Sequence, residues 1–140
     1  LERLQVTGVD VLRGVEDERA FQAGINNRVT AEGLAQLLRA IAEGSAFTPE
    51  LSARMLDILH KQKFRSGIPA RLPREVRVAH KTGDISTVAH DAGIVFVPHR
   101  KPYVLVVLTE WPPEATGRSS IIATISREVY ELLTGEVSNA

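Results

Sequence analysis

The spacing of apolar residues in the first half of the chain predicts two amphipathic helices joined as a hairpin. The first helix has apolar residues at i, i+3, i+4 and i+7, namely Leu34, Leu37, Leu38 and Ile41. Thr30 is its expected N-cap and Gly44 its stop, because a threonine hydroxyl accepts from free N–H groups and glycine tolerates left-handed geometry. The second helix is expected to begin after Thr48, with Pro49 and Glu50 in its first turn. Its expected apolar stripe is Leu51, Met55, Ile58 and Leu59.

Three strands are predicted after the helices, over residues 76–82, 92–97 and 103–109. The first strand alternates apolar and polar side chains, whereas the third is apolar on both faces. A polar turn, His99-Arg100-Lys101, lies between prolines and joins the last two strands as a hairpin. The strands are therefore expected to lie in chain order, with charged residues marking the first as an exposed edge. The third strand should be covered on both faces and should lie centrally, so a partner strand is missing from the chain.

The remaining segments complete an α+β organisation. Residues 1–29 have loop chemistry, with a short helical turn expected around residues 16–21. Residues 63–75 form a connector, and a last helix is expected to begin at Ser119 or Ser120 and to stop at Gly135. The expected apolar face of that helix consists of Ile121, Ile122, Ile125, Val129, Leu132 and Leu133. The predicted division is residues 1–75, a loop segment with the helical hairpin, and residues 76–140, the antiparallel sheet with the last helix.

Composition narrows the classes of function. The chain has 140 residues, of which 44% are hydrophobic, so it can bury a core. Its 17 basic and 17 acidic residues balance, and only 5% of residues are aromatic, which argues against a nucleic-acid partner. No stretch approaches the length of a membrane span. The chain starts at Leu1-Glu2-Arg3, and we expect it to be the interior of a longer precursor.

Metal and cofactor chemistry is not expected from this sequence. Cysteine is absent, which excludes disulfides and thiol catalysis in this chain. The four histidines lie on a predicted helix, a strand and two loops, without the spacing of metal ligands. We therefore expect neither a metal site nor a cofactor.

The tripeptide Lys81-Thr82-Gly83 is the main candidate for function, at the end of the first predicted strand. A lysine ammonium held on a rigid strand can anchor a substrate carboxylate, and the threonine hydroxyl can share that contact. Gly83 would leave room for a substrate along the strand edge. The alternative is a strand end with a solvated lysine. The tripeptide alone is weak evidence, so its context decides between these interpretations.

In that context the chain resembles the C-terminal part of a class A β-lactamase or of a relative in the penicillin-binding-protein group. Residues 26–38 resemble the segment that leaves the omega loop of that family, and residues 48–63 resemble the following helix. The Lys-Thr-Gly strand, the two later strands and residues 120–133 follow in the family's order. The resemblance implies the serine β-lactamase/transpeptidase-like fold, in which an antiparallel sheet is packed with helices. It also implies acyl transfer through a serine.

The resemblance assigns expected roles to five residues. Lys81 and Thr82 would hold the substrate carboxylate, Gly83 would shape the strand edge, and the backbone N–H of Asp84 would be an oxyanion donor. Glu16 is the best candidate for the omega-loop carboxylate that activates the deacylating water, although the residues usual after that glutamate are absent. A solvated loop acid is the alternative for Glu16. Asn27 is either a turn residue or a brace for this loop through Arg13.

The sequence departs from the family at the nucleophile. It contains neither Ser-x-x-Lys nor Ser-Asp-Asn, so the serine and its base are missing. The first hypothesis is therefore the carboxylate-anchoring part of a β-lactamase-like serine hydrolase, inactive on its own. A D-alanyl-D-alanine carboxypeptidase or esterase on the same scaffold and a non-catalytic peptide-binding module are the alternatives. The expected partners are a β-lactam or peptide-like small molecule and either a missing N-terminal part or a second copy. The resemblance implies a periplasmic or secreted protein.

Overall fold

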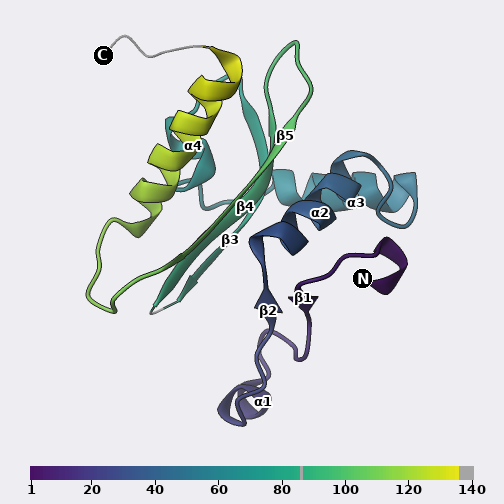
Figure 1. Cartoon of the computed structure of the whole chain (residues 1–140), viewed down its shortest axis with the longest axis vertical. Coiled ribbons are helices and arrows are strands. Elements are labelled where there is room, and N and C mark those ends of the chain that lie inside the picture. The colour runs from purple at the N-terminus through teal and green to yellow at the C-terminus, as the bar shows by residue number, and fades with distance from the viewer. Residues whose placement is uncertain (86, 136–140) are drawn as a thin grey trace.

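A three-stranded antiparallel sheet forms the centre of the molecule, with helices on both of its faces (Figure 1). The computed structural model describes residues 1–85 and 87–135. The sheet consists of β3 (Arg77–Ile85), β4 (Val88–Phe96) and β5 (Tyr103–Glu110) in that order. Helices α2 (Ala31–Ala42) and α3 (Pro49–His60) cover one face, and α4 (Arg118–Thr134) covers the other. The predicted α+β class and strand order are confirmed.

The smaller elements lie before the sheet in the chain. A short 3-10 turn, η1 (Glu2–Leu4), precedes β1 (Val9–Asp10), α1 (Glu18–Gln22) and β2 (Arg28–Val29). β1 and β2 pair with each other, and together with α1 they extend away from the sheet (Figure 1). A second 3-10 turn, η2 (Ile68–Arg71), lies within the predicted connector. Among the described residues, no helix is both long enough and apolar enough to cross a bilayer.

The helical hairpin has the predicted caps. The Thr30 hydroxyl accepts a hydrogen bond from the Gly33 N–H at 3.0 Å, and the Thr48 hydroxyl accepts one from the Leu51 N–H at 3.2 Å. Gly44 follows α2 with a left-handed φ of +73°. These local signals fixed both helix starts, because a cap needs only residues that are near in sequence.

The apolar stripe predicted for α3 is partly wrong. Met55 and Leu59 pack in the core, but Leu51 and Ile58 are exposed. The buried stripe begins instead at Ser52, which is 1% exposed and donates its hydroxyl hydrogen bonds to the carbonyls of Ala46 and Thr48. A serine whose hydroxyl is hydrogen-bonded in this way can occupy a buried position. A pattern that counts only apolar residues does not predict such a position.

The strands are longer than predicted at the turn between β3 and β4. Gly83 pairs with His90 and Asp84 with Ala89, so Gly83 lies inside β3 rather than at its end. The prediction failed because a glycine does not end a strand when the neighbouring strand continues the ladder. The predicted hairpin turn between β4 and β5 is confirmed, and His99 there has a left-handed φ of +60°.

Both faces of β5 are covered, as predicted. Leu105 and Val107 pack in the core on the α4 side, whereas Val104 and Val106 pack in the core with α2. The expected central position is not found, because β5 lies at one edge of the sheet in the part of the chain that the structure describes. A partner strand for this edge stays a prediction.

Helix α4 begins earlier and buries a different face than predicted. Its N-cap is Gly117 rather than a serine, because the helix begins at Arg118, although Gly135 ends it as expected. The buried residues are Ile122, Ala123, Ser126 and Tyr130. Of the predicted face only Ile122 is fully buried, and Ile121, Ile125, Leu132 and Leu133 are exposed.

Candidate active site

A hollow of about 400 Å³ lies along β3, and we call it the Lys81 pocket. Four of the five predicted site residues line it, namely Lys81, Thr82, Gly83 and Asp84. The opposite walls come from Phe64, Ser66 and Gly67 of the connector, from β4 and from the first two turns of α4. Three segments that are far apart in sequence therefore meet around the tripeptide.

The geometry of β3 gives the tripeptide the features of an anion-binding edge. Successive side chains alternate between the faces, so Lys81 and Thr82 approach the pocket from different sides of the strand. The Lys81 ammonium is exposed and donates to the carbonyl of Thr82. β3 is an edge strand of the described sheet, so its outward N–H and C=O groups can pair with an extended ligand.

Gly83 is not required by the fold. A Cβ on this residue would lie 3.8 Å from the Cβ of His90, which is an ordinary contact. Its φ does not lie in the left-handed region, so a side chain would not strain the backbone. The absence of a side chain at Gly83 is therefore consistent with a role in the pocket itself.

An ion pair at the rim of the pocket connects β3 to α4. Arg118 Nη2 lies 2.6 Å from Asp84 Oδ1, and Arg118 Nη1 donates to the Ile85 carbonyl at 3.0 Å. The Asp84 side chain is 58% exposed, so this pair is screened by solvent and adds little stability. Its main effect is to neutralise a carboxylate among the residues that line the pocket. The pocket consequently keeps one cation available for an anionic ligand.

Two further polar residues of the pocket region were missed by the sequence analysis. His80 Nδ1 lies 2.8 Å from Asp91 Oδ1, and both side chains are almost fully buried. His80 precedes Lys81, and Asp91 lines the Lys81 pocket. A signal was present, because each lies two positions from a buried apolar residue of its strand, His80 from Val78 and Asp91 from Ala89, and so shares its face. His90 also lines the pocket, and its Nδ1 accepts from the Thr109 N–H at 3.0 Å.

Glu16 is not brought to the Lys81 pocket. It is exposed, in the loop between β1 and α1, and it lines none of the hollows found in the described residues. Its main-chain carbonyl accepts a hydrogen bond from the Glu18 N–H at 3.0 Å, which keeps it within the turn before α1. A role in water activation therefore stays a prediction without geometric support.

Asn27 braces the loop that carries Glu16. Its Oδ1 accepts from the N–H groups of Leu12 and Arg13 at 2.8 and 3.0 Å, and its Nδ2 donates to the Arg13 carbonyl at 3.1 Å. The predicted brace is confirmed, but it runs through the main chain of Arg13. The Arg13 guanidinium instead donates to the carbonyls of Gly14 and Val15.

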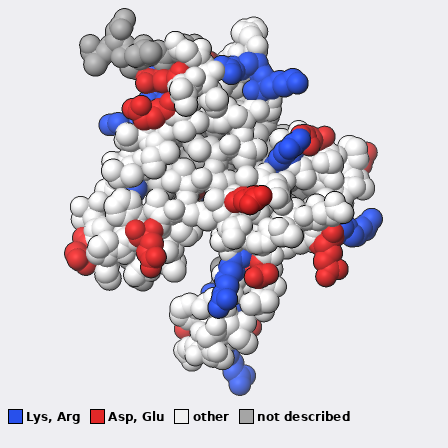
Figure 2. Space-filling view, viewed as in Figure 1, with Lys and Arg blue, Asp and Glu red and all other residues white. Residues whose placement is uncertain are grey.

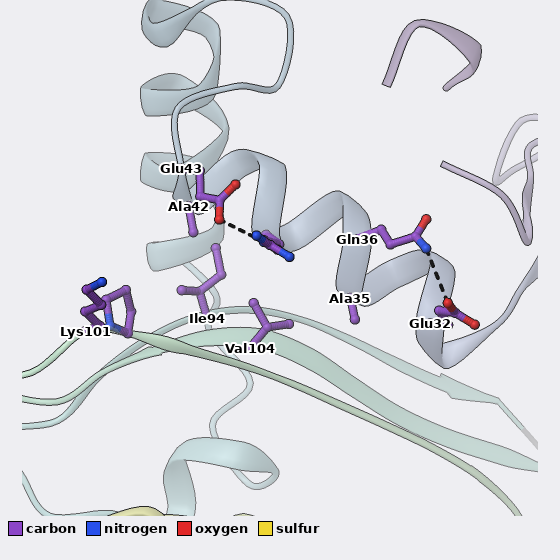
Figure 3. Close-up of a pocket in the computed structure, with 10 residues that line it drawn as sticks. Glu32, Ala35, Gln36, Ala42, Glu43, Ile94, Lys101 and Val104 are labelled. Carbon is purple, nitrogen blue, oxygen red and sulfur yellow. Dashed lines mark hydrogen bonds and ion pairs between the residues drawn. The ribbon is translucent and has the colours of Figure 1, made fainter. Parts of the chain in front are cut away.

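A larger hollow of about 790 Å³, the α2–β5 groove, lies between α2 and the edge strand (Figure 3). Ile94 and Val104 form its apolar floor, and charged side chains stand above them. Arg39 and Glu43 form an ion pair of 2.8 Å on this rim. The groove offers neither a nucleophile nor a cluster of catalytic groups, so it has the character of a packing surface.

Charge does not single out another site. Figure 2 shows Lys, Arg, Asp and Glu scattered over the face in view without a gathered patch of either sign. Within residues 1–85 and 87–135, no three His, Asp or Glu side chains come together in a way that could hold a metal ion. The Lys81 pocket is therefore the candidate active site.

Comparison with known proteins shows a family and similar folds. Residues 1–133 match the model of a family described as the beta-lactamase enzyme family. A comparison with curated proteins found no match. The fold is similar to the structure of PBP-A, with a TM-score of 0.83 and 27% identity, covering 96% of this chain and 49% of that one. A PBP-A mutant in an acyl-enzyme complex with penicillin G is similar with a TM-score of 0.82 and 28% identity, covering 96% and 49%.

A third solved structure also has a fold similar to that of this chain. It is a beta-lactamase from Sphaerobacter thermophilus, with a TM-score of 0.81, 23% identity and coverage of 98% of this chain and 52% of that chain. The chain thus spans about half the length of the solved structures it matches.

Proposed function

The chain belongs to the beta-lactamase enzyme family, and we propose that it supplies the substrate-carboxylate side of a serine hydrolase that opens a β-lactam through a serine acyl-enzyme. The observation that carries this proposal is the meeting of Lys81, Thr82, Gly83 and Asp84 at one pocket on an edge strand. The Lys81 ammonium and the Thr82 hydroxyl would bind the substrate carboxylate by charge-assisted hydrogen bonds. The Asp84 N–H would donate to the oxyanion of the tetrahedral intermediate.

The nucleophile is proposed to come from a further part of the protein. The chain has no Ser-x-x-Lys, and it spans about half the length of its solved relatives. We propose that this further part, or a second copy of the chain, also pairs with the free edge of β5. The substrate is a β-lactam or a peptide-like small molecule, and the protein acts in the periplasm or outside the cell. No metal, cofactor or nucleic acid takes part in the proposed reaction.

A second candidate function is that of a D-alanyl-D-alanine carboxypeptidase or esterase. The absence of Glu16 from the residues that line the Lys81 pocket supports it, because poor activation of water leaves the acyl-enzyme intact. The two PBP-A structures, at 27% and 28% identity, are also closer in sequence to this chain than the Sphaerobacter beta-lactamase at 23%. The deacylation rate of the complete protein separates the two functions. Rapid turnover of a cephalosporin would exclude the carboxypeptidase.

Lys81→Ala is expected to weaken the binding of penicillin G by about 10- to 100-fold. The reason is that a hydrogen bond between charged groups contributes roughly 1.5–3 kcal/mol, and each 1.4 kcal/mol is about tenfold in affinity. Binding is measured by NMR titration, following the amide signals of Thr82 and Gly83 in the 140-residue chain.

The matched control is Lys101→Ala, which removes a lysine from the α2–β5 groove. It should leave the affinity for penicillin G within about twofold of the wild type, since that groove is not the proposed site. Equal weakening by both substitutions would point to non-specific attraction of the anion. Unchanged affinity in Lys81→Ala would refute the proposed role of Lys81.

A fluorescent penicillin is expected to leave the 140-residue chain without a covalent label. Acylation needs an activated serine, and no serine of this chain has a lysine three positions later. Gel fluorescence after incubation, with a known penicillin-binding enzyme as positive control, is the measurement. A stable label on the isolated chain would show that it carries its own nucleophile.

A further inference from the structure

His80 and Asp91 form a buried polar pair behind the Lys81 pocket. Each residue is 1% exposed, and His80 Nδ1 lies 2.8 Å from Asp91 Oδ1. In the tautomer that carries its proton on Nδ1, His80 donates to this carboxylate oxygen. Gly93, across the ladder, lets β4 lie close to His80, because a Cβ there would lie 2.6 Å from the Cβ of His80.

The second carboxylate oxygen of Asp91 holds the opposite wall of the pocket. Asp91 Oδ2 accepts from the Ile68 N–H at 2.8 Å, and a Cβ on the preceding Gly67 would lie 2.3 Å from that oxygen. The Ile68 carbonyl accepts from the hydroxyl of Ser126 at 2.8 Å. A buried polar chain thus connects β3, β4, η2 and α4.

The location of this chain relates it to the proposed carboxylate site. His80 is the residue before Lys81 on β3, and its side chain points to the other face of the strand. Asp91 is paired with Thr82 in the ladder and, like Gly67, lines the pocket. The His80–Asp91 pair therefore joins the strand that carries Lys81 and Thr82 to the connector that faces them.

Stability alone does not account for a pair of this kind. Buried ion pairs are often replaceable by apolar side chains without loss of stability. His80 Nε2 is moreover buried without a hydrogen-bond partner among the described residues, which costs free energy. What the pair does provide is a fixed position of two pocket walls relative to each other.

We propose that His80 and Asp91 are positioning residues that set the orientation of Lys81 toward a substrate carboxylate. This inference rests on the proposed function of the Lys81 pocket. It makes His80 act through Lys81, so the two residues should be energetically coupled when a ligand binds. A merely structural histidine would not show that coupling.

The test compares substitutions of His80 in the 140-residue chain, with penicillin G as the ligand and NMR titration as the measurement. His80→Phe keeps a ring but removes the donor to Asp91, and it is expected to raise the Kd about tenfold. His80→Asn places an amide N–H near the position of Nδ1 and should keep the Kd within about threefold of the wild type. In a Lys81→Ala background, His80→Phe should have almost no further effect on the Kd.

Ser52→Ala is the matched control, because it removes another buried polar side chain, on α3, whose hydrogen bonds lie outside the pocket. It should leave the Kd unchanged whatever its effect on stability. If Lys81→Ala itself does not weaken binding, the proposed function fails. The positioning role is overturned if Lys81→Ala weakens binding but folded His80→Phe does not. It is also overturned if His80→Phe weakens binding equally in the wild type and in the Lys81→Ala background.

A measurement on the wild-type chain covers the case in which His80→Phe does not fold. The ¹⁵N signals of the His80 ring should move with saturation of the site by penicillin G and should stay still in Lys81→Ala. Ring signals of His80 that do not respond while the Thr82 amide signal shifts would overturn the inference.

Discussion

Tyr130→Ala is expected to lower the free energy of unfolding by about 3–5 kcal/mol, as large aromatic truncations in a core do. Tyr130 is 2% exposed and packs in the core between α4 and the sheet. Leu132→Ala, two residues further on the same helix, is expected to change the free energy of unfolding by no more than about 0.5 kcal/mol. Leu132 is 83% exposed, so its truncation leaves no cavity.

Urea unfolding followed by circular dichroism measures both changes, with equal m-values as the condition for comparing them. Tyr130→Phe separates the ring from its hydroxyl, and it should retain most of the stability if the cavity is the main cause. Similar losses in Tyr130→Ala and Leu132→Ala would mean that α4 packs by the other face.

The same helix shows where sequence patterns fail. Its apolar residues form two neighbouring stripes, and periodicity favoured the one with more isoleucine and leucine. The structure buries the stripe that contains Ser126 and Tyr130. The hydrogen bond from Ser126 to the Ile68 carbonyl crosses 58 residues of sequence, so local spacing could not reveal it.

Features that depend on near neighbours were predictable. The caps at Thr30 and Thr48, the order of the strands and the turn at His99 each follow from a few adjacent residues. The tripeptide at Lys81 also led to the pocket that it lines. Family membership was readable as well, because several short segments occur in one characteristic order.

Features that depend on distant contacts were not predictable in the same way. Glu16 was predicted to belong to the site only because of the resemblance to the family. In the described residues it does not line the Lys81 pocket. The His80–Asp91 pair was missed because its meaning appears only when β3 and β4 are in register. A polar residue on the same strand face as buried apolar residues is the sequence signal that points to such a pair.

Residues 103–109 are expected to pair with a strand from outside these 140 residues. Both faces of β5 are already covered by α2 and α4, so burial of its side chains no longer demands a partner. The free edge of β5 still calls for a partner strand. It presents a row of main-chain groups on an apolar strand, without the charges that normally discourage pairing. The α2–β5 groove beside it has an apolar floor that such a partner would also cover (Figure 3).

Hydrogen exchange measured by NMR, together with sedimentation, tests this expectation. In a monomeric chain, alternate amides of β5 should exchange rapidly, since antiparallel strands point alternate N–H groups to each side. In the paired form, with a second copy or the complementing part, those amides should slow by at least about 100-fold. The outward amides of β3 serve as the internal control, because they belong to the opposite edge and should stay fast. A monodisperse monomer in which Val104, Val106 and Leu108 and their neighbours are all protected would show that β5 needs no partner strand.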